Sequence, residues 1–360
     1  MSERPQASGP GEGVPPGTTL DGADDAAVAV AAAILREGGL VAFPTETVYG
    51  LGADATNAAA VGRIFRVKGR PADHPLIVHL ADVSGLAPWP AELPDAARAV
   101  AEGFWPGPLT LVLRRSHLVP DAVTGGRDTV GLRVPDHPVA RALLREVGGV
   151  AAPSANRFGR VSPTAAADVA ADLGTDVDLI LDGGPCTVGV ESTILDLSTG
   201  VAEILRPGGV SASQLAAVLG RVPEVWRGDG AARAPGMLAA HYAPTAEVRV
   251  VTMDELGAAA RTARATGRVV GVLAPRAVDG LDGDAAPGDG HDDRDLRSGE
   301  VIELEPAGDA AHYAHVLYAR LRQADRLGID LLLVVPPPDE GVGRAVNDRL
   351  RRAATGSRRP

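Results

Sequence analysis

Cysteine is almost absent from this 360-residue sequence, which contains Cys186 as its single thiol. One cysteine excludes an internal disulfide and any metal cluster that is built from several thiolates. No run of about 18 apolar residues occurs, so the sequence predicts no membrane-spanning helix. The first residues are rich in Pro, Gly and polar side chains and lack the apolar segment of a signal peptide. We therefore expect a cytoplasmic protein with a disordered tail over residues 1–19.

Positive charge is also in short supply, because 35 Lys and Arg residues face 46 Asp and Glu residues and leave a net charge of −11. Nucleic-acid binding takes most of its affinity from the neutralisation of phosphates, so this balance argues against a general nucleic-acid binder. A local basic cleft is still compatible with it. The length and the hydrophobic content of 45% are sufficient for two domains with cores of their own.

Segments with strand and helix patterns alternate along the chain, which is typical of an α/β or α+β fold with a mixed twisted sheet. Residues 223–246 lack a clear period and are expected to form a linker between a first domain, 20–222, and a small βαβ-type domain, 247–356. A Gly- and Asp-rich loop is expected at 277–299. Strands are predicted at 40–43, 75–80, 109–114, 130–135, 150–153, 179–182, 191–197, 203–206, 248–251, 269–273, 301–304 and 330–335. Helices are predicted at 21–37, 58–67, 95–104, 137–146, 162–173, 211–219, 254–265, 310–326 and 343–354.

The densest group of functional side chains lies in residues 38–80. Small polar residues follow the first buried strand, Lys68 and Arg70 flank Gly69, and His74 and His79 flank the next strand. Arginine grips phosphate oxygens through its planar fork and lysine adds a compact charge, so the group suits a polyanion beside a small polar substrate. The plainer alternatives are a solvated helix end for the cations and a satisfied core position for His79. No third ligand at metal-site spacing accompanies the histidines, so we expect no protein-held zinc.

A second group of polar residues follows the strand predicted at 150–153. Ser154, Asn156 and Ser162 could hydrogen-bond a phosphate or adenine at the start of the next helix. Alternatively, Ser162 before Pro163 is a plain helix N-cap, and one residue could serve both purposes. Neither Gly-x-x-x-x-Gly-Lys-Ser/Thr nor Gly-x-Gly-x-x-Gly occurs between a strand and a helix, so a nucleotide would be held by scattered cations and hydroxyls. Ser192 lies in no nucleophile-elbow pattern.

Taken together, the motifs resemble those of one family, Sua5/YrdC/YciO, and they occur in family order. The linker and the second domain resemble the two-domain Sua5 branch. The resemblance covers about residues 20–355. The matching segments are Pro44-Thr45-Glu46-Thr47-Val48-Tyr49-Gly50-Leu51-Gly52, Lys68-Gly69-Arg70-Pro71, Pro75-Leu76-Ile77-Val78-His79, Trp105-Pro106-Gly107-Pro108-Leu109-Thr110, Pro153-Ser154-Ala155-Asn156, Ser162-Pro163-Thr164, Glu191-Ser192-Thr193, Leu205-Arg206-Pro207-Gly208, Pro235-Gly236-Met237 and His241-Tyr242-Ala243-Pro244.

The resemblance implies a YrdC-like twisted open sheet with a concave cavity, followed by a small Rossmann-like C-terminal Sua5 domain. It also implies L-threonylcarbamoyladenylate synthase activity, a nucleotidyl transfer in which L-threonine, bicarbonate or CO2 and ATP with Mg²⁺ give threonylcarbamoyl-AMP and pyrophosphate. A separate transferase complex would then modify adenosine 37 of tRNAs that read ANN codons, to give threonylcarbamoyladenosine (t6A). No stable tRNA binding and no membrane association are expected.

The resemblance also assigns roles to residues of this sequence. Lys68 and Arg70 would be the catalytic cations. His74 and Phe158 depart from the family pattern, which usually has Asn and Ser at these positions. The nucleotide would be held by Lys68, Arg70, His74, Thr129, Ser154, Asn156, Ser162, Arg206, His241 and Tyr242. Threonine would be held by Thr47, His79, Arg133, Ala152 and Ser192.

Other functions stay open on the residues alone. The concave cavity could bind RNA directly, although the acidic balance disfavours this. A carbamoyl transferase of the hydrogenase-maturation type has the same fold, but its zinc-finger and acylphosphatase-like segments are absent here. A hydrolase could use Ser154 or Ser192 with His79. For the second domain we expect a role in positioning the linker.

Overall fold

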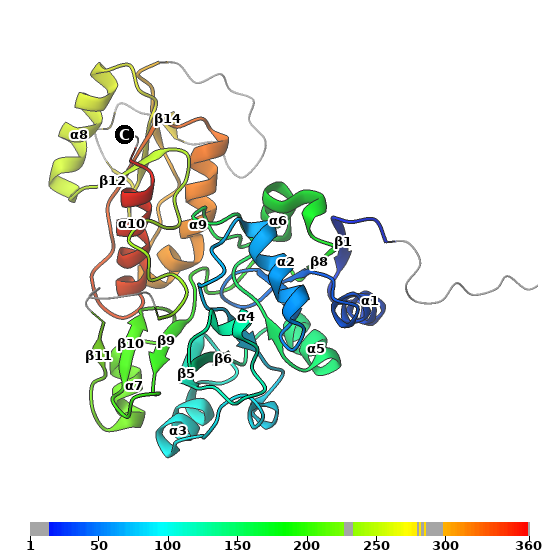
Figure 1. Cartoon of the computed structure of the whole chain (residues 1–360). Helices are drawn as coiled ribbons and strands as arrows, with labels where there is room; N and C mark the ends of the chain where they lie inside the picture. Colours follow the sequence, from blue (N-terminus) through cyan, green and yellow to red (C-terminus); the bar gives the residue numbers. More distant parts are fainter. Residues whose placement is uncertain (1–13, 227–232, 279–280, 282–283, 286–297, 359–360) are drawn as a thin grey trace, which may run out of the picture.

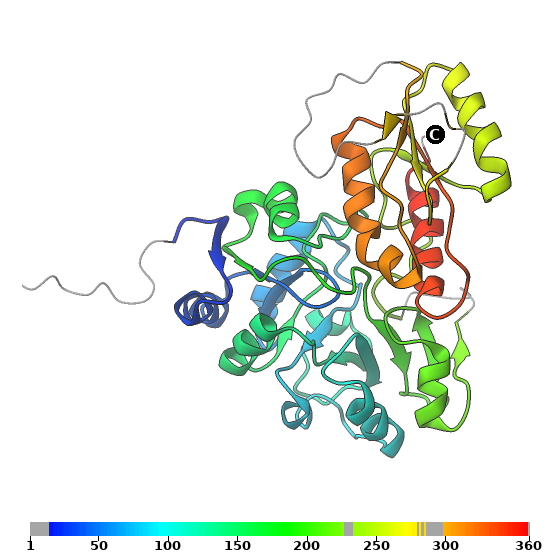
Figure 2. The same ribbon diagram turned by 180° about the vertical axis from the view of Figure 1, so that it is seen from behind.

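The structure is a computed structural model that describes residues 14–226, 233–278, 281, 284–285 and 298–358. The described residues form a sheet of eleven strands and a sheet of five strands. Figure 1 shows the larger sheet with its helices in blue to green and the smaller one in yellow to red, and Figure 2 shows them from behind. The expected mixed α/β fold with two parts is confirmed.

The larger sheet is mixed. Its parallel pairs include β1 with β8 and β4 with β6, and its antiparallel pairs include β2 with β3 and β5 with β6. In spatial order the strands are β1 (Thr18–Asp21), β8 (Leu179–Asp182), β2 (Val41–Phe43), β3 (Gly50–Asp54), β7 (Val150–Ala151), β4 (Ile77–His79), β6 (Thr129–Arg133), β5 (Leu109–Arg114), β9 (Thr193–Asp196), β10 (Glu203–Arg206) and β11 (Glu224–Val225).

Helices cover this sheet and position its connecting turns. Asn57 caps α2, because its side chain accepts bonds from the N–H groups of Ala59 and Ala60, both at 3.1 Å. The helix ends at Lys68, and its C-cap, Gly69, has a φ of 63° that lets the chain turn out of the helix just before Arg70. The helices are α1 (Asp25–Arg36), α2 (Ala58–Lys68), α3 (Asp95–Phe104), α4 (Asp121–Thr124), α5 (Pro138–Val147), α6 (Ala166–Leu173) and α7 (Ala212–Leu219).

Four strands were not predicted from the sequence: β1, β3, β11 and β14 (Asp284–Ala285). Strand β3 contains Gly50 and Gly52, which weaken a strand pattern. Gly52 is required here, because a Cβ on it would lie 2.8 Å from both the Phe43 ring and a Val150 methyl group. Strand β1 includes the last two residues of the expected tail, and residues 1–13 of that tail lie outside the described residues.

The helix predicted from Ser162 begins later, and the alternative in which Ser162 is its N-cap is not observed. Helix α6 starts at Ala166 with Ala165 as its N-cap, and the Asp168 carboxylate accepts from the N–H groups of Thr164 and Ala165 at 3.1 and 3.2 Å. The Ser162 hydroxyl donates instead to a carboxylate in the site described below, which removes it from the helix end.

The smaller sheet is parallel throughout its described strands, as expected of a Rossmann-like domain. Its order differs from the 3-2-1-4-5-6 arrangement of dinucleotide-binding sheets. Most of the loop expected at 277–299 lies outside the described residues. The strands, in spatial order, are β12 (Glu247–Val250), β16 (Leu331–Val334), β13 (Val270–Leu273), β15 (Val301–Glu303) and β14 (Asp284–Ala285), and the helices are α8 (Met253–Ala265), α9 (Ala310–Arg326) and α10 (Gly343–Gly356).

The two parts share one hydrophobic cluster. Helices α9 and α10 lie on the side of the small sheet that faces the larger one (Figures 1 and 2). Val48, Val161 and Val190 of the first part pack in the same cluster as Tyr318 and Val346 of these helices. Within the described chain, none of the helices has both the length and the hydropathy that a membrane span requires.

Candidate active site

A polar cavity lies where several strands of the larger sheet end, under the segment that connects the two parts. Ten of the residues predicted for the site line it, and they come from turns and strand ends that are far apart in the sequence. The parallel register of β4 and β6 places His79 opposite Arg133, and an isolated bridge joins Gly50 to Ser154. The predicted residues that line the cavity are Thr47, Arg70, His79, Arg133, Ala152, Ser154, Ser192, Arg206, His241 and Tyr242.

Two guanidinium groups in the cavity have no carboxylate partner among the described residues. Arg70 donates to the carbonyl of Pro75 at 2.9 Å, and Arg206 donates to the carbonyls of Ser192 at 2.9 Å and Pro235 at 3.1 Å. Both side chains are buried. Burial and the nearby charge of Arg206 lower the pKa of Arg70 to about 10, which still leaves it protonated at neutral pH. Buried cations that meet only neutral oxygens favour an anionic ligand.

The third guanidinium, Arg133, is neutralised by a buried carboxylate. Its Nη2 lies 2.7 Å from Oε1 of Glu46, and the N–H of Asp136 holds the other carboxylate oxygen at 3.0 Å. Beside this ion pair, the Thr45 and Thr47 hydroxyls share a hydrogen bond of 2.8 Å. This end of the cavity therefore presents paired charges and hydroxyls, which suits a small polar molecule that carries both signs of charge.

His79 is buried in the cavity wall and its Nδ1 has no hydrogen-bond partner among the described residues. Burial, with the neighbouring charge of Arg133, lowers the pKa of His79 to about 3. The imidazole is thus neutral at physiological pH. A buried polar atom without a partner is costly, so this nitrogen is a candidate contact for a bound ligand.

Lys68 and Asn156 support a turn of the cavity wall without lining the cavity. The Lys68 ammonium donates to the carbonyls of Ser154 and Asn156, both at 2.5 Å. Burial, followed by the charge of Arg70, lowers the pKa of Lys68 well below its usual value. The Asn156 amide donates to the carbonyls of Arg157 and Arg160 at 2.7 and 2.9 Å. The sequence predicted direct ligand contacts for both; in this geometry their polar groups shape the turn that carries Ser154.

The connecting segment closes one side of the cavity with His241 and Tyr242, both buried. Tyr242 has a φ of 60°, a conformation that non-glycine residues rarely adopt outside functional sites. The side-chain oxygen of Tyr242 and Nδ1 of His241 have no partner among the described residues. Gly236 makes this closure possible, because it has a φ of 76° and a Cβ there would lie 2.5 Å from the Tyr242 hydroxyl.

Glu191 is a central residue that the sequence reasoning placed in a motif without giving it a role. Its Oε1 accepts from the Ser162 hydroxyl at 2.7 Å, and its Oε2 accepts from Tyr318 at 2.8 Å and from Nε of Arg349 at 2.9 Å. Burial alone would raise the pKa of Glu191, but Arg349, Arg206 and these hydrogen bonds lower it to about 2. No local signal marks Tyr318 or Arg349 as site residues, because both lie on helices of the second part.

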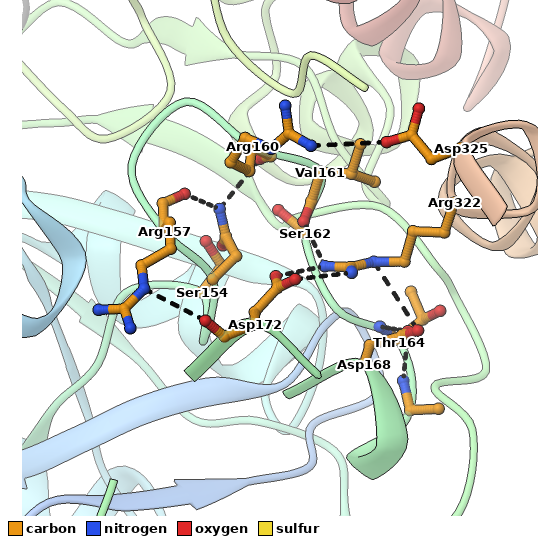
Figure 3. A network of polar contacts seen from close by, with 12 residues as sticks. Ser154, Arg157, Arg160, Val161, Ser162, Thr164, Asp168, Asp172, Arg322 and Asp325 are labelled. Atoms are coloured by element: carbon orange, nitrogen blue, oxygen red, sulfur yellow. Dashed lines mark hydrogen bonds and ion pairs between the residues drawn. The ribbon is translucent and has the colours of Figure 1, made fainter. Parts of the chain in front are cut away.

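A second polar network joins α9 to the turn that follows Ser154 (Figure 3). Arg322 donates to both carboxylate oxygens of Asp172 at 3.0 and 2.7 Å and to the carbonyl of Val161 at 2.6 Å. Arg160 and Asp325 form a looser pair at 3.6 Å. The second part of the chain therefore contacts both helix α6 and the segment 154–162.

Thr129 and His74 lie outside the cavity lining. Thr129 borders an adjoining hollow that shares Ile77 and Pro235 with the main cavity. The His74 ring contacts Phe158 with ring centroids 5.6 Å apart, and Phe158 contacts His241 at 6.0 Å. His74 and Phe158, the two residues that depart from the family pattern, are thus neighbours. Phe158 in turn contacts His241 of the connecting segment.

The hydrolase alternative finds no support in the hydrogen bonds. The Ser192 hydroxyl bonds with Thr110 at 2.8 Å and accepts from Arg206 at 3.2 Å, and no bond joins Ser154 or Ser192 to His79 in the described structure. A serine nucleophile requires a base within hydrogen-bond reach. No group of three or more His, Cys, Asp or Glu side chains within the described ranges could hold a metal ion.

Comparison with known proteins agrees with this architecture. Residues 33–208 match the Sua5/YciO/YrdC family model, which carries the description "telomere recombination", and residues 210–355 match the model of the threonylcarbamoyl-AMP synthase C-terminal domain. The chain therefore belongs to the Sua5/YciO/YrdC family, in its two-domain Sua5 form. This membership confirms the resemblance that the motifs indicated.

Relatives match over both parts of the chain. It is 43% identical to a threonylcarbamoyl-AMP synthase of Pyrococcus abyssi, covering 91% of this chain and 94% of that protein. Identity to the Bacillus subtilis protein of the same name is 42%, covering 92% of this chain and 94% of that protein. The solved structure of P. abyssi Sua5 complexed with L-threonine is 40% identical, with a TM-score of 0.82, covering 93% of this chain and 96% of that chain.

Proposed function

We propose that this protein is a threonylcarbamoyl-AMP synthase, which condenses L-threonine, bicarbonate or CO2 and ATP to threonylcarbamoyl-AMP and pyrophosphate. Relatives of that name match 91–92% of the chain. The observation that carries the proposal is the pair Arg70 and Arg206, buried in one cavity with neutral oxygens as their only hydrogen-bond partners among the described residues. A triphosphate supplies the negative charge that such a pair favours.

Threonine would occupy the end of the cavity around Arg133. The guanidinium of Arg133 suits the carboxylate of the amino acid, while Glu46 and the hydroxyl of Thr47 suit its ammonium and hydroxyl groups. The neutral imidazole of His79 can accept or donate without adding charge. Ser192 and the backbone of Ala152 would complete this subsite. The structure of P. abyssi Sua5 complexed with L-threonine supports threonine as a ligand.

ATP would extend from this subsite toward the connecting segment. Arg70, Arg206 and Ser154 would contact phosphate oxygens directly, with Mg²⁺ arriving as part of the nucleotide substrate. Lys68, Asn156 and Ser162 would act on the phosphates through the turn that they fix. His241 and Tyr242 would cover the nucleotide, and His74 and Thr129 would contact its outer parts.

The chemistry requires positioning and charge neutralisation more than a nucleophile from the protein. The threonine amine and CO2 form a carbamate with loss of a proton. A carbamate oxygen then attacks the α-phosphorus, and the bond from this phosphorus to the oxygen bridging to the β-phosphorus breaks, so pyrophosphate leaves. Because a carbamate decomposes in water, the cover formed by His241 and Tyr242 would protect it.

The product would serve a separate transferase complex that modifies adenosine 37 of tRNAs reading ANN codons. We expect no stable tRNA binding by this chain, because its net charge of −11 repels a polyanion outside the cavity. We also propose that the protein acts in the cytoplasm, where the tRNA is located.

Replacement of Arg70 with Ala tests the proposal. We expect threonine-dependent pyrophosphate release from ATP to fall by about a hundredfold or more, which is the usual effect of removing one donor to a developing charge. Arg66→Ala is the matched control, because Arg66 is an exposed arginine of the same helix end. Threonine binding by calorimetry should survive in both variants. Wild-type protein that releases no pyrophosphate with threonine, or an Arg70→Ala variant with unchanged release, would contradict the assignment.

A further inference from the structure

Arg349 of helix α10 reaches the cavity wall from the second part of the chain. Its side chain is fully buried, with 0% exposure. The Nε atom donates to Glu191 at 2.9 Å, and the Nη1 atom donates to the carbonyl of Pro207 at 2.8 Å and to Asp348, which Arg352 also binds, at 2.9 Å. The guanidinium carbon also lies 5.4 Å from the centre of the Tyr242 ring. One side chain thus contacts the segments that carry Ser192, Arg206 and the cover of the cavity.

The loop before Glu191 is fitted closely to helix α9. The carbonyl of Thr187 lies 3.2 Å from Nδ1 of His315. Gly189 has a φ of 77°, and a Cβ at this position would lie 2.5 Å from the carbonyl oxygens of both Ala314 and His315. This spacing admits only glycine, so the loop and the helix backbone are in direct contact. The second part of the chain therefore fixes both the path of the loop and the charge state of its carboxylate.

Glu191 is an acidic residue in the wall of a cavity that we propose for a triphosphate. A buried carboxylate without a partner would attract Arg206 and repel phosphate oxygens, and both effects weaken nucleotide binding. Arg349, which does not line the cavity, offsets the charge of Glu191. The guanidinium of Arg206 then keeps carbonyl and hydroxyl partners and remains available for an anion.

We propose that Arg349 is a positioning residue of the active site, which neutralises Glu191 so that Arg206 and the cavity can accept the nucleotide, an inference that rests on the proposed function. Arg349 also positions Tyr242 through the contact with its ring, and the end of β10 through the bond to the Pro207 carbonyl. The smaller sheet with its helices is then a component of the nucleotide site, which would be incomplete without it.

The test compares Arg349→Met with the double variant Arg349→Met/Glu191→Gln. The single change leaves a buried carboxylate without its main partner, so we expect the KM for ATP to rise by about tenfold or more, with a smaller change in the KM for threonine. The double change removes both charges and should recover most of the lost ATP affinity. Arg344→Met on the same helix is the control, because Arg344 is exposed and bonds to the carbonyl of Asp339.

A purely structural role for Arg349 makes a different prediction. In that case the double variant would lose thermal stability and ATP affinity at least as much as the single variant, and this result would overturn the inference. If Arg349→Met does not fold, the double variant alone tests the inference. A KM for ATP within about threefold of the wild-type value supports the neutralisation of Glu191 by Arg349, and a larger rise refutes it. Calorimetric measurement of the binding of a non-hydrolysable ATP analogue to the full chain distinguishes failure of the proposed function from failure of the inference about Arg349. Failure of the wild type to bind it counts against the proposed function, whereas equal binding by wild type and Arg349→Met counts against the inference.

Discussion

At the scale of single residues, the arginines of the cavity differ by their partners. Arg133 in the cavity is paired with Glu46, whereas Arg349, which lies outside the cavity lining, is paired with Glu191 and Asp348. Arg70 and Arg206 face carbonyl and hydroxyl oxygens. The sequence identified Arg70, Arg133 and Arg206 but could not rank them, because ion pairs between distant segments leave no local pattern. This distribution of partners is what singles out the two arginines that suit a polyphosphate.

Gly236 offers a sharp test of the cover. Ala at this position should destabilise the protein by about 1–2 kcal/mol because of its positive φ. In addition, its Cβ would displace the Tyr242 hydroxyl, 2.5 Å away, and the Arg206 side chain, 3.0 Å away, so the KM for ATP should rise. The measurements are denaturant unfolding and steady-state pyrophosphate release.

Gly220→Ala is the control for Gly236→Ala. Gly220 also has a positive φ, 70°, but a Cβ there meets open space. We expect a similar loss of stability with an unchanged KM for ATP. Equal effects of the two substitutions on ATP would show that the cover has no part in nucleotide binding.

At the scale of elements, periodicity predicted the helices with good accuracy, because their apolar faces repeat along the sequence. Helix α9 occupies 310–326, as predicted. The failures have physical reasons. Strand β3 has glycines where Phe43 needs space, and α6 starts after Ser162 because that hydroxyl is used by Glu191. Ten of the residues that line the cavity were predicted from motifs. Glu191, Tyr318 and Arg349 take their roles from contacts between separate elements.

The contact between α9 and α6 should contribute to the stability of both parts. Arg322→Ala removes the forked bond to Asp172 and the bond to the Val161 carbonyl. The side chain of Arg322 is only 12% exposed, so we expect a loss of roughly 2–3 kcal/mol in the free energy of unfolding, measured with denaturant.

Arg160→Ala provides the comparison for Arg322→Ala. The Arg160 side chain is 49% exposed and its pair with Asp325 is long, so its removal should cost less than about 1 kcal/mol. The contact between the two helices would be unimportant for stability if Arg322→Ala were equally mild.

At the scale of the whole molecule, two buried histidines link stability to pH. Burial lowers the pKa of His79 and of His241 to about 3, while the unfolded chain binds a proton near pH 6.5. Below pH 6.5 the unfolded state takes up protons that the folded state refuses, so stability falls as the pH falls toward 3. Between pH 7.5 and pH 5 each histidine should lower the free energy of unfolding by on the order of 2 kcal/mol.

Denaturant unfolding of His79→Gln at several pH values measures this contribution. The variant should show a flatter dependence of stability on pH than the wild type. His117→Gln, which changes an exposed histidine, should keep the wild-type slope. Parallel pH profiles for wild type and His79→Gln would mean that folding does not shift the pKa of His79.

The apolar cluster shared by the two sheets has a consequence for how this protein could be divided. Val48, Val161 and Val190 are buried in the cluster that also contains residues of helices α9 and α10. A chain truncated just after the connecting segment would expose this apolar surface to solvent. Glu191 would also lose its ion pair with Arg349. We therefore expect the part of this protein that contains the larger sheet to be poorly soluble on its own. A truncated form would require polar substitutions on the exposed apolar surface.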